Sequence, residues 1–131
     1  MAYELSGFNI PGLSAAADLS AKQYYCVKKN TTNNEAALCA TDGEIVFGVL
    51  QNKPTSGEAA EVMALGVTKV TAAETLTAGD AWGTDANGKA RIVDAASTGA
   101  VVGDFTAGTV IEGASAGELA TVTIGLINFR D

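Results

Sequence analysis

The sequence contains no histidine in 131 residues. Its absence excludes Ser-His-Asp and Cys-His catalysis, histidine zinc sites and the usual proton shuttle near neutral pH. The two cysteines alone are too few for a structural zinc site. We therefore expect no catalytic residue, no metal site and no cofactor, and a protein that is not an enzyme.

Positive charge is scarce. Eight Lys and Arg residues stand against 15 Asp and Glu residues, which gives a net charge of −7. The basic residues are scattered and form no stripe that could follow a phosphate backbone. An anionic lipid surface would also repel an acidic chain. We therefore expect neither nucleic acid nor a membrane as a partner.

Long apolar runs are missing as well. No segment approaches the roughly 20 apolar residues of a membrane-spanning helix. Residues 1–5 lack the basic and apolar regions of a secretory signal. We expect synthesis and assembly in a cytoplasm.

Proline occurs only twice, whereas glycine occurs 15 times and hydrophobic residues make up 47% of the chain. Frequent glycine with threonine and valine is typical of short strands joined by tight turns. The sequence predicts an all-β fold, a compact β-barrel or β-sandwich with short hairpins. Residues 1–20, where Gly7, Pro11 and Gly12 interrupt any period, predict an extended N-terminal arm. Residues 21–131 predict a single β-rich domain.

Strands are predicted where β-branched, aromatic and aliphatic residues lie between turn signals. The predicted ranges are 23–28, 36–40, 45–50, 61–70, 80–84, 89–93, 100–105, 109–112 and 119–129. Asn87-Gly88 is the strongest hairpin signal, because both residues tolerate positive φ.

The longest predicted strand, residues 61–70, is apolar on both faces in its middle. A half-exposed strand would alternate more cleanly between apolar and polar residues. We therefore expect other polypeptide to cover both faces, either from the same domain or from another subunit. Met63, Leu65 and Val67 are the candidate residues of a subunit interface.

An offset of 60 residues relates two segments of the sequence, at about 40–70 and 100–129. It pairs Gly43 with Gly103, Gly48 with Gly108, Gly57 with Gly117, Glu58 with Glu118, and Val62 with Val122. Two related β units in one domain would produce this pattern. Coincidence between strand-turn-strand sequences of similar composition would also produce it.

Cys26 and Cys39 are equidistant from the middle of a polar loop, residues 30–34. If that loop is a hairpin tip, the two cysteines lie opposite each other and a cross-strand disulfide is conceivable. We favour two buried free thiols, because a cytoplasm keeps thiols reduced.

Two apparent motifs in residues 83–90 are incomplete. Gly83 to Lys89 fits the phosphate-binding pattern G-x-x-x-x-G-K, but Ala90 stands where a hydroxyl should hold Mg²⁺. Asp85 to Gly88 resembles the start of a calcium loop, but the acidic residue at the loop's end is replaced by Ala96. A polar hairpin explains both. No pair of the dispersed carboxylates is singled out for glycoside hydrolysis.

Four segments together resemble the capsid decoration, or head cement, proteins of tailed bacteriophages. The most specific is Gly48 to Val70, which begins Gly-Val-Leu-Gln-Asn-Lys-Pro. The other three are Asp18 to Tyr25 followed by Val27-Lys28, Ala78 to Asp80 with Asp85 to Ala90, and Ala116 to Glu118 with Val122 to Ile124. The resemblance covers most of the chain beyond the first seventeen residues.

This resemblance implies a β-rich virion protein on the outer surface of an icosahedral phage head. Such a protein would bind the major capsid protein as a homotrimer at three-fold and quasi-three-fold positions, and would stabilise the shell against the pressure of packaged DNA. The N-terminal arm is the candidate capsid contact, through Tyr3, Leu5, Phe8 and Ile10. Alternatively, the arm folds onto its own trimer.

Two other classes of function remain open. One is a tail, spike or adhesion β module, which would share the composition. The other is a small β-barrel hydrolase, which the missing histidine disfavours.

Overall fold

The structure is a computed structural model that describes residues 2, 5–93, 105–125 and 128–129. These residues form strands and turns without a helix, so the all-β prediction is confirmed. Accordingly, none of them belongs to a helix able to cross a membrane. The strands are β1 (Leu5–Ile10), β2 (Ser14–Ala15), β3 (Cys26–Lys29), β4 (Glu35–Leu38), β5 (Gly48–Leu50), β6 (Val62–Thr71), β7 (Ala81–Thr84), β8 (Ala90–Ile92), β9 (Phe105–Thr106), β10 (Gly108–Glu112), β11 (Leu119–Ile124) and β12 (Asn128–Phe129). Most of the strand predicted at 100–105 lies outside the described residues.

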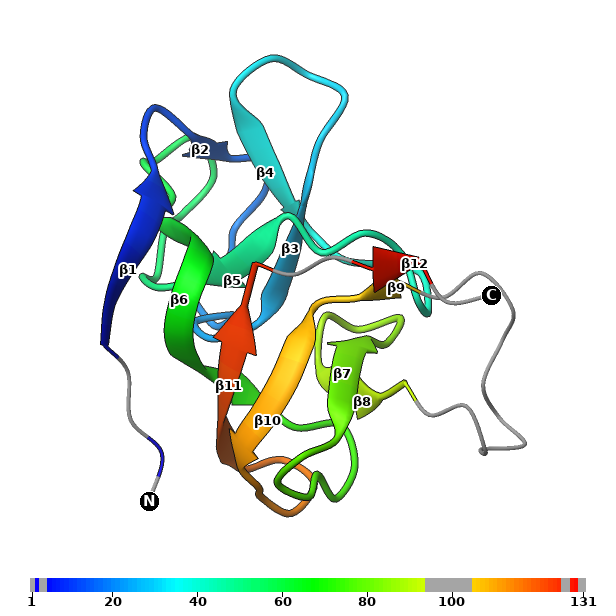
Figure 1. Ribbon diagram of the computed structural model, residues 1–131. Coiled ribbons are helices and arrows are strands. Elements are labelled where there is room, and N and C mark those ends of the chain that lie inside the picture. The colour runs from blue at the N-terminus through cyan, green and yellow to red at the C-terminus, as the bar shows by residue number, and fades with distance from the viewer. Residues whose placement is uncertain (1, 3–4, 94–104, 126–127, 130–131) are drawn as a thin grey trace.

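Ten strands form one sheet in the order β2-β4-β3-β5-β6-β11-β10-β7-β8, with β1 added beside β6. The remaining two, β9 and β12, pair with each other. The path does not close on itself, so the barrel, one of the two expected forms, is wrong. Figure 1 shows β6 and β11 between β1–β5 on one side and β7, β8 and β10 on the other.

Two apolar cores lie within this sheet. The larger core surrounds Trp82 and includes Val70 and Val122, while the smaller core includes Leu13 and Leu19. Successive residues of a strand point to opposite faces of the sheet. In β3, β5 and the start of β6, one residue therefore enters the larger core and its neighbour enters the smaller one. The pairs are Cys26 and Val27, Val49 and Leu50, and Met63 and Val62.

Residues 5–20 pack against their own chain. β1 pairs with β6 in antiparallel register, with Phe8 opposite Leu65 and Ile10 opposite Val62. β2 pairs with β4, and Leu13 is buried in the smaller core. Residues 5–10 are thus a strand of the sheet, despite the glycine within them.

Gly7 allows the close approach of β1 to β6. A Cβ atom at Gly7 would lie 2.9 Å from Met63 Sδ and would also overlap the carbonyl oxygen of Leu65. Opposite it, Gly66 has φ +141°, a conformation that side chains rarely adopt, and a Cβ there would lie 2.9 Å from Gly7 Cα. Two facing glycines therefore fix the position of β1.

The predicted hairpin at Asn87-Gly88 is confirmed, since β7 and β8 pair with Thr84 opposite Ala90. Gly88 has φ +77°. The Asp85 carboxylate accepts hydrogen bonds from the backbone N–H groups of Asn87 and Lys89, at 2.9 and 2.8 Å. The residues that resembled a phosphate loop and a calcium loop thus form a strand, a turn and a returning strand.

The 60-residue offset also relates contacts in the structure. Leu50 pairs with Val62 in the β5–β6 hairpin, and Val110 pairs with Val122 in the β10–β11 hairpin. In the turns before the second strands, Gly57 has φ +81° and Gly117 has φ +85°. That the two hairpins are related β units stays a prediction.

Cys26 and Cys39 are free and fully buried. They occupy facing positions on β3 and the continuation of β4, where the Cys39 N–H donates to the Cys26 carbonyl at 3.1 Å. Burial raises the pKa of the Cys39 thiol to about 12, with a further contribution from the Glu44 carboxylate. Both cysteines therefore act as small core residues.

Candidate interaction surface

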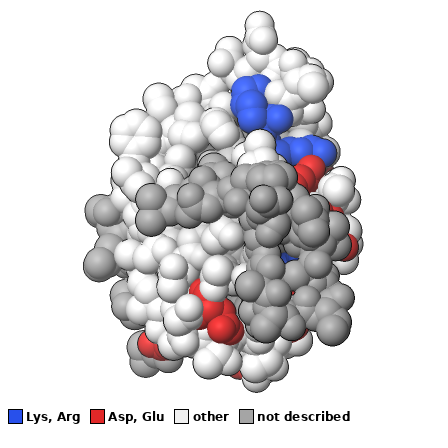
Figure 2. Space-filling view, turned by 45° about the vertical axis from the view of Figure 1, so that its right-hand side comes forward, with Lys and Arg blue, Asp and Glu red and all other residues white. Residues whose placement is uncertain are grey.

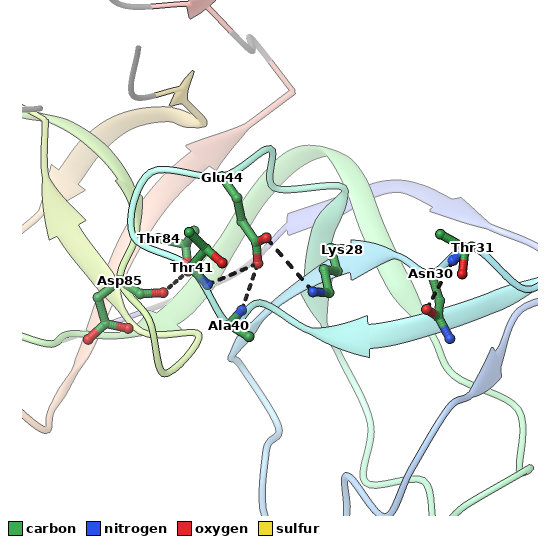
Figure 3. A network of polar contacts seen from close by, with 8 residues as sticks. All are labelled: Lys28, Asn30, Thr31, Ala40, Thr41, Glu44, Thr84 and Asp85. Atoms are coloured by element: carbon green, nitrogen blue, oxygen red, sulfur yellow. Dashed lines mark hydrogen bonds and ion pairs between the residues drawn. The ribbon is translucent and has the colours of Figure 1, made fainter. Parts of the chain in front are cut away.

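Several acidic side chains accept hydrogen bonds from backbone N–H groups in nearby loops of the same chain. The Glu44 carboxylate accepts hydrogen bonds from the backbone N–H groups of Ala40 and Thr41, at 2.6 and 3.4 Å, and lies 3.8 Å from the Lys28 ammonium. Figure 3 shows this carboxylate between the 40–44 loop and β3. Among the described residues, no three Cys, Asp or Glu side chains group closely enough to hold a metal ion. The exposed apolar side chains are therefore the main candidates for a functional surface.

Among the described residues, the large apolar side chains with the greatest exposure are Phe8 and Leu65, at 62% and 56%. They are register partners on β1 and β6. Val67, two residues further along β6, is half-buried and lies on the same face as Leu65. We call Phe8, Leu65 and Val67 the β1–β6 patch. It combines one residue expected to contact the capsid with two expected at a subunit interface.

The other candidate residues have different environments. Met63 is 5% exposed and belongs to the larger core. Ile10 is partly buried and packs against the smaller core. Leu5 pairs through its backbone with Val67, and Tyr3 lies outside the described residues. The structure thus brings Phe8, Leu65 and Val67 together, and directs Ile10 and Met63 inward.

The strands around the β1–β6 patch carry little charge. β1 and β11 contain no charged residue, and β6 contains only Lys69. The Lys69 ammonium lies 5.4 Å from the centre of the Tyr24 ring. On the side of the molecule that Figure 2 turns forward, acidic and basic residues also form only small groups among other described residues. The patch is thus apolar and uncharged in a chain of net charge −7.

A second apolar region was not selected from the sequence. Ile45 is 50% exposed. Together with Phe47 and Phe105 it lines a hollow of about 450 Å³, which Lys28, Lys29 and Glu44 also line. The alternation of Ile45 and Phe47 around buried Val46 was the available signal, because it gives residues 45–47 one apolar outer face.

Comparison with known proteins supports the fold. No protein-family model and no curated protein sequence matches this chain. Among solved structures, it is similar to the head fiber gp8.5 N base in bacteriophage phi29. The TM-score is 0.66 at 19% sequence identity, over 90% of this chain and 92% of the other. The likeness thus spans nearly all of both chains and establishes a shared β fold.

Proposed function

We propose that this chain is a structural protein of a tailed-phage head. It binds the outer surface of the capsid as a homotrimer, contacts the major capsid protein, and stabilises the shell against internal DNA pressure. The observation that carries this proposal is the fold likeness, over 90% of this chain, to the head fiber N base of phage phi29. The decoration-protein resemblance of residues 48–70 points to the same part of the virion by a separate route.

The physical basis of such a role is mechanical. A trimer that touches several shell subunits gains affinity, because each contact raises the effective concentration of the next. A net charge of −7 also disfavours contact with packaged nucleic acid. This role requires a stable fold and contact surfaces, and it needs no catalytic group.

The test is binding to phage heads that lack their outer proteins. Purified protein should sediment with such heads to a fixed stoichiometry and raise the temperature at which they release DNA. Heads of an unrelated phage serve as the control. Failure to bind the heads of the phage that encodes the chain would refute the proposal.

A second candidate is the base of a longer surface fibre, which the name of the phi29 protein favours. Electron microscopy of the virion distinguishes the two, because decoration gives compact knobs on the shell and a base carries a projecting fibre.

A further inference from the structure

The middle of β6 presents an apolar surface that its own chain leaves open. The Leu65 side chain lies beside Gly125, where an added Cβ would come 2.5 Å from Leu65 Cδ1. Even so, 56% of Leu65 and 62% of the neighbouring Phe8 remain exposed. Contiguous exposed apolar side chains on a soluble protein are a common mark of an interaction site.

The charge distribution identifies the kind of partner. Copies of a chain with net charge −7 repel each other wherever their carboxylates approach. Of the strands that form or border the β1–β6 patch, β1 and β11 contain no charged residue and β6 contains only Lys69. Because the patch is uncharged, a charged partner surface would gain no electrostatic complementarity by binding to it. An uncharged apolar surface is, however, complementary to an identical surface.

The form of β1 indicates how the contact is made. Within the described residues β1 is paired with β6 alone, so its other edge is open. Its register with β6 shifts between Leu5 and Phe8 and again between Phe8 and Asn9. Such bulges hinder the addition of another strand to an edge. The partner therefore packs on the side chains of the patch.

We infer that the β1–β6 patch is the surface through which copies of this chain associate, with the patches of neighbouring copies meeting around a shared symmetry axis. The inference rests on the proposed function in taking self-assembly as part of the protein's role. It moves Phe8 from the capsid contact to the contact between copies, and it places Leu65 beside it. A patch on the axis is contacted by its own equivalents, as closed symmetric assemblies allow.

The first test uses three exposed apolar residues. Phe8→Ser and Leu65→Thr alter the patch, while Ile45→Thr changes a side chain of similar exposure outside it. Light scattering and sedimentation equilibrium give the mass relative to the 13.2 kDa chain. We expect the two patch variants to raise the dissociation constant at least about tenfold, and Ile45→Thr to leave it unchanged. A monomeric native protein, or patch variants that associate normally, would overturn the inference.

A second test does not depend on those variants folding well. Leu65→Cys places a thiol in the patch and Ile45→Cys places one outside it, while Cys26 and Cys39 are fully buried. A short bis-maleimide should link Leu65→Cys into covalent dimers, since each chain offers one accessible thiol, and should leave Ile45→Cys monomeric. Equal linking of the two variants would count against a contact at the patch.

Head binding, measured on the same variants, separates this inference from the proposed function. If Leu65→Thr associates normally but no longer binds heads, the patch faces the shell and the inference is wrong, while the proposed function stands. If association depends on Leu65 but native protein binds no head, the inference stands and the proposed function fails.

Discussion

The start and the middle of β6 lie in different environments, although both are apolar in sequence. At Val62 and Met63 the strand runs between the two cores, and its own chain covers both faces. At Leu65, two residues further on, 56% of the side chain is exposed. Packing within the single chain thus explains why Val62 and Met63 are apolar, whereas association with other chains would explain why Leu65 is apolar.

Truncating Met63 and Leu65 in turn tests whether the two positions contribute differently to stability and to association. Met63→Ala should lower the free energy of unfolding by about 2–5 kcal/mol, because it opens a cavity in the larger core. Leu65→Ala should cost the single chain less than about 1 kcal/mol. Chemical denaturation at several protein concentrations measures both. The Met63→Ala loss should be independent of concentration, and the Leu65→Ala loss should grow as association increases. Equal, concentration-independent losses would mean that the two positions do not differ in kind.

A smaller effect is expected from Gly7→Ala, which tests how β1 is held on β6. The new Cβ would collide with the Leu65 carbonyl oxygen and approach Met63 Sδ. Overpacking of this kind costs about 1–3 kcal/mol. Amide hydrogen exchange should show faster exchange in β1 and little change in β7 and β8. A control, Gly12→Ala, adds a methyl group where no atom lies within 4 Å, although its φ of +78° adds strain. Unchanged protection of β1 in Gly7→Ala would contradict the close approach seen here.

The second half of β6 should respond more weakly to loss of a hydrogen bond. Thr68 is fully buried, and its Oγ1 accepts a hydrogen bond from Gln51 Nε2 at 3.0 Å. Thr68→Val keeps the shape, and Gln51 Nε2 retains the Val49 carbonyl at 2.9 Å. We expect a loss of about 1 kcal/mol in the free energy of unfolding, measured by denaturant titration. Thr71→Val, at a half-buried position, is the control. A loss of unfolding free energy as large as that of Met63→Ala would show that hydrogen bonding, more than packing, stabilises the buried part of β6.

The smallest expected effect concerns the turn before β6. Hydrogen bonds from the Thr55 hydroxyl and backbone N–H lower the pKa of the exposed Glu58 carboxyl from its usual value of 4.5. A lowered folded-state pKa stabilises the fold fully above the unfolded pKa, and this contribution disappears as pH falls through the folded value. Glu58→Gln should therefore slightly reduce the melting temperature at pH 7 and not at the acidic end of a pH series. A constant difference at all pH values would exclude this carboxylate as the cause.

Local features were predictable from the sequence because they depend on neighbouring residues. The strand at 61–70 and the hairpin at Asn87-Gly88 follow from β-branched residues and from tolerance of positive φ. Whether the sheet closes depends on pairings between distant strands, so the barrel could not be excluded in advance. The role of Gly7 was missed for the same reason. In sequence, Gly7 indicates an interruption of a strand. Only the facing Gly66 shows that it allows β1 to approach β6 closely.

The candidate surface was predicted in part. Leu65 and Phe8 were both selected for apolar character, but they were assigned to different contacts because nothing local shows that β1 and β6 are neighbours. Met63 and Ile10 fit the same pattern and point inward. Period alone cannot separate a face covered by the chain's own core from one left open. A deletion of residues 2–14 would remove a strand and a core leucine, so point substitutions are the better probe.

A cryo-electron microscopy map of phage heads carrying this protein would show the β1–β6 patch in its assembled state. We expect three copies at each site, with Phe8 and Leu65 of each copy packed against those of its neighbours. A map with Leu65 facing solvent in a solitary knob, or with heads carrying no added density, would contradict this expectation.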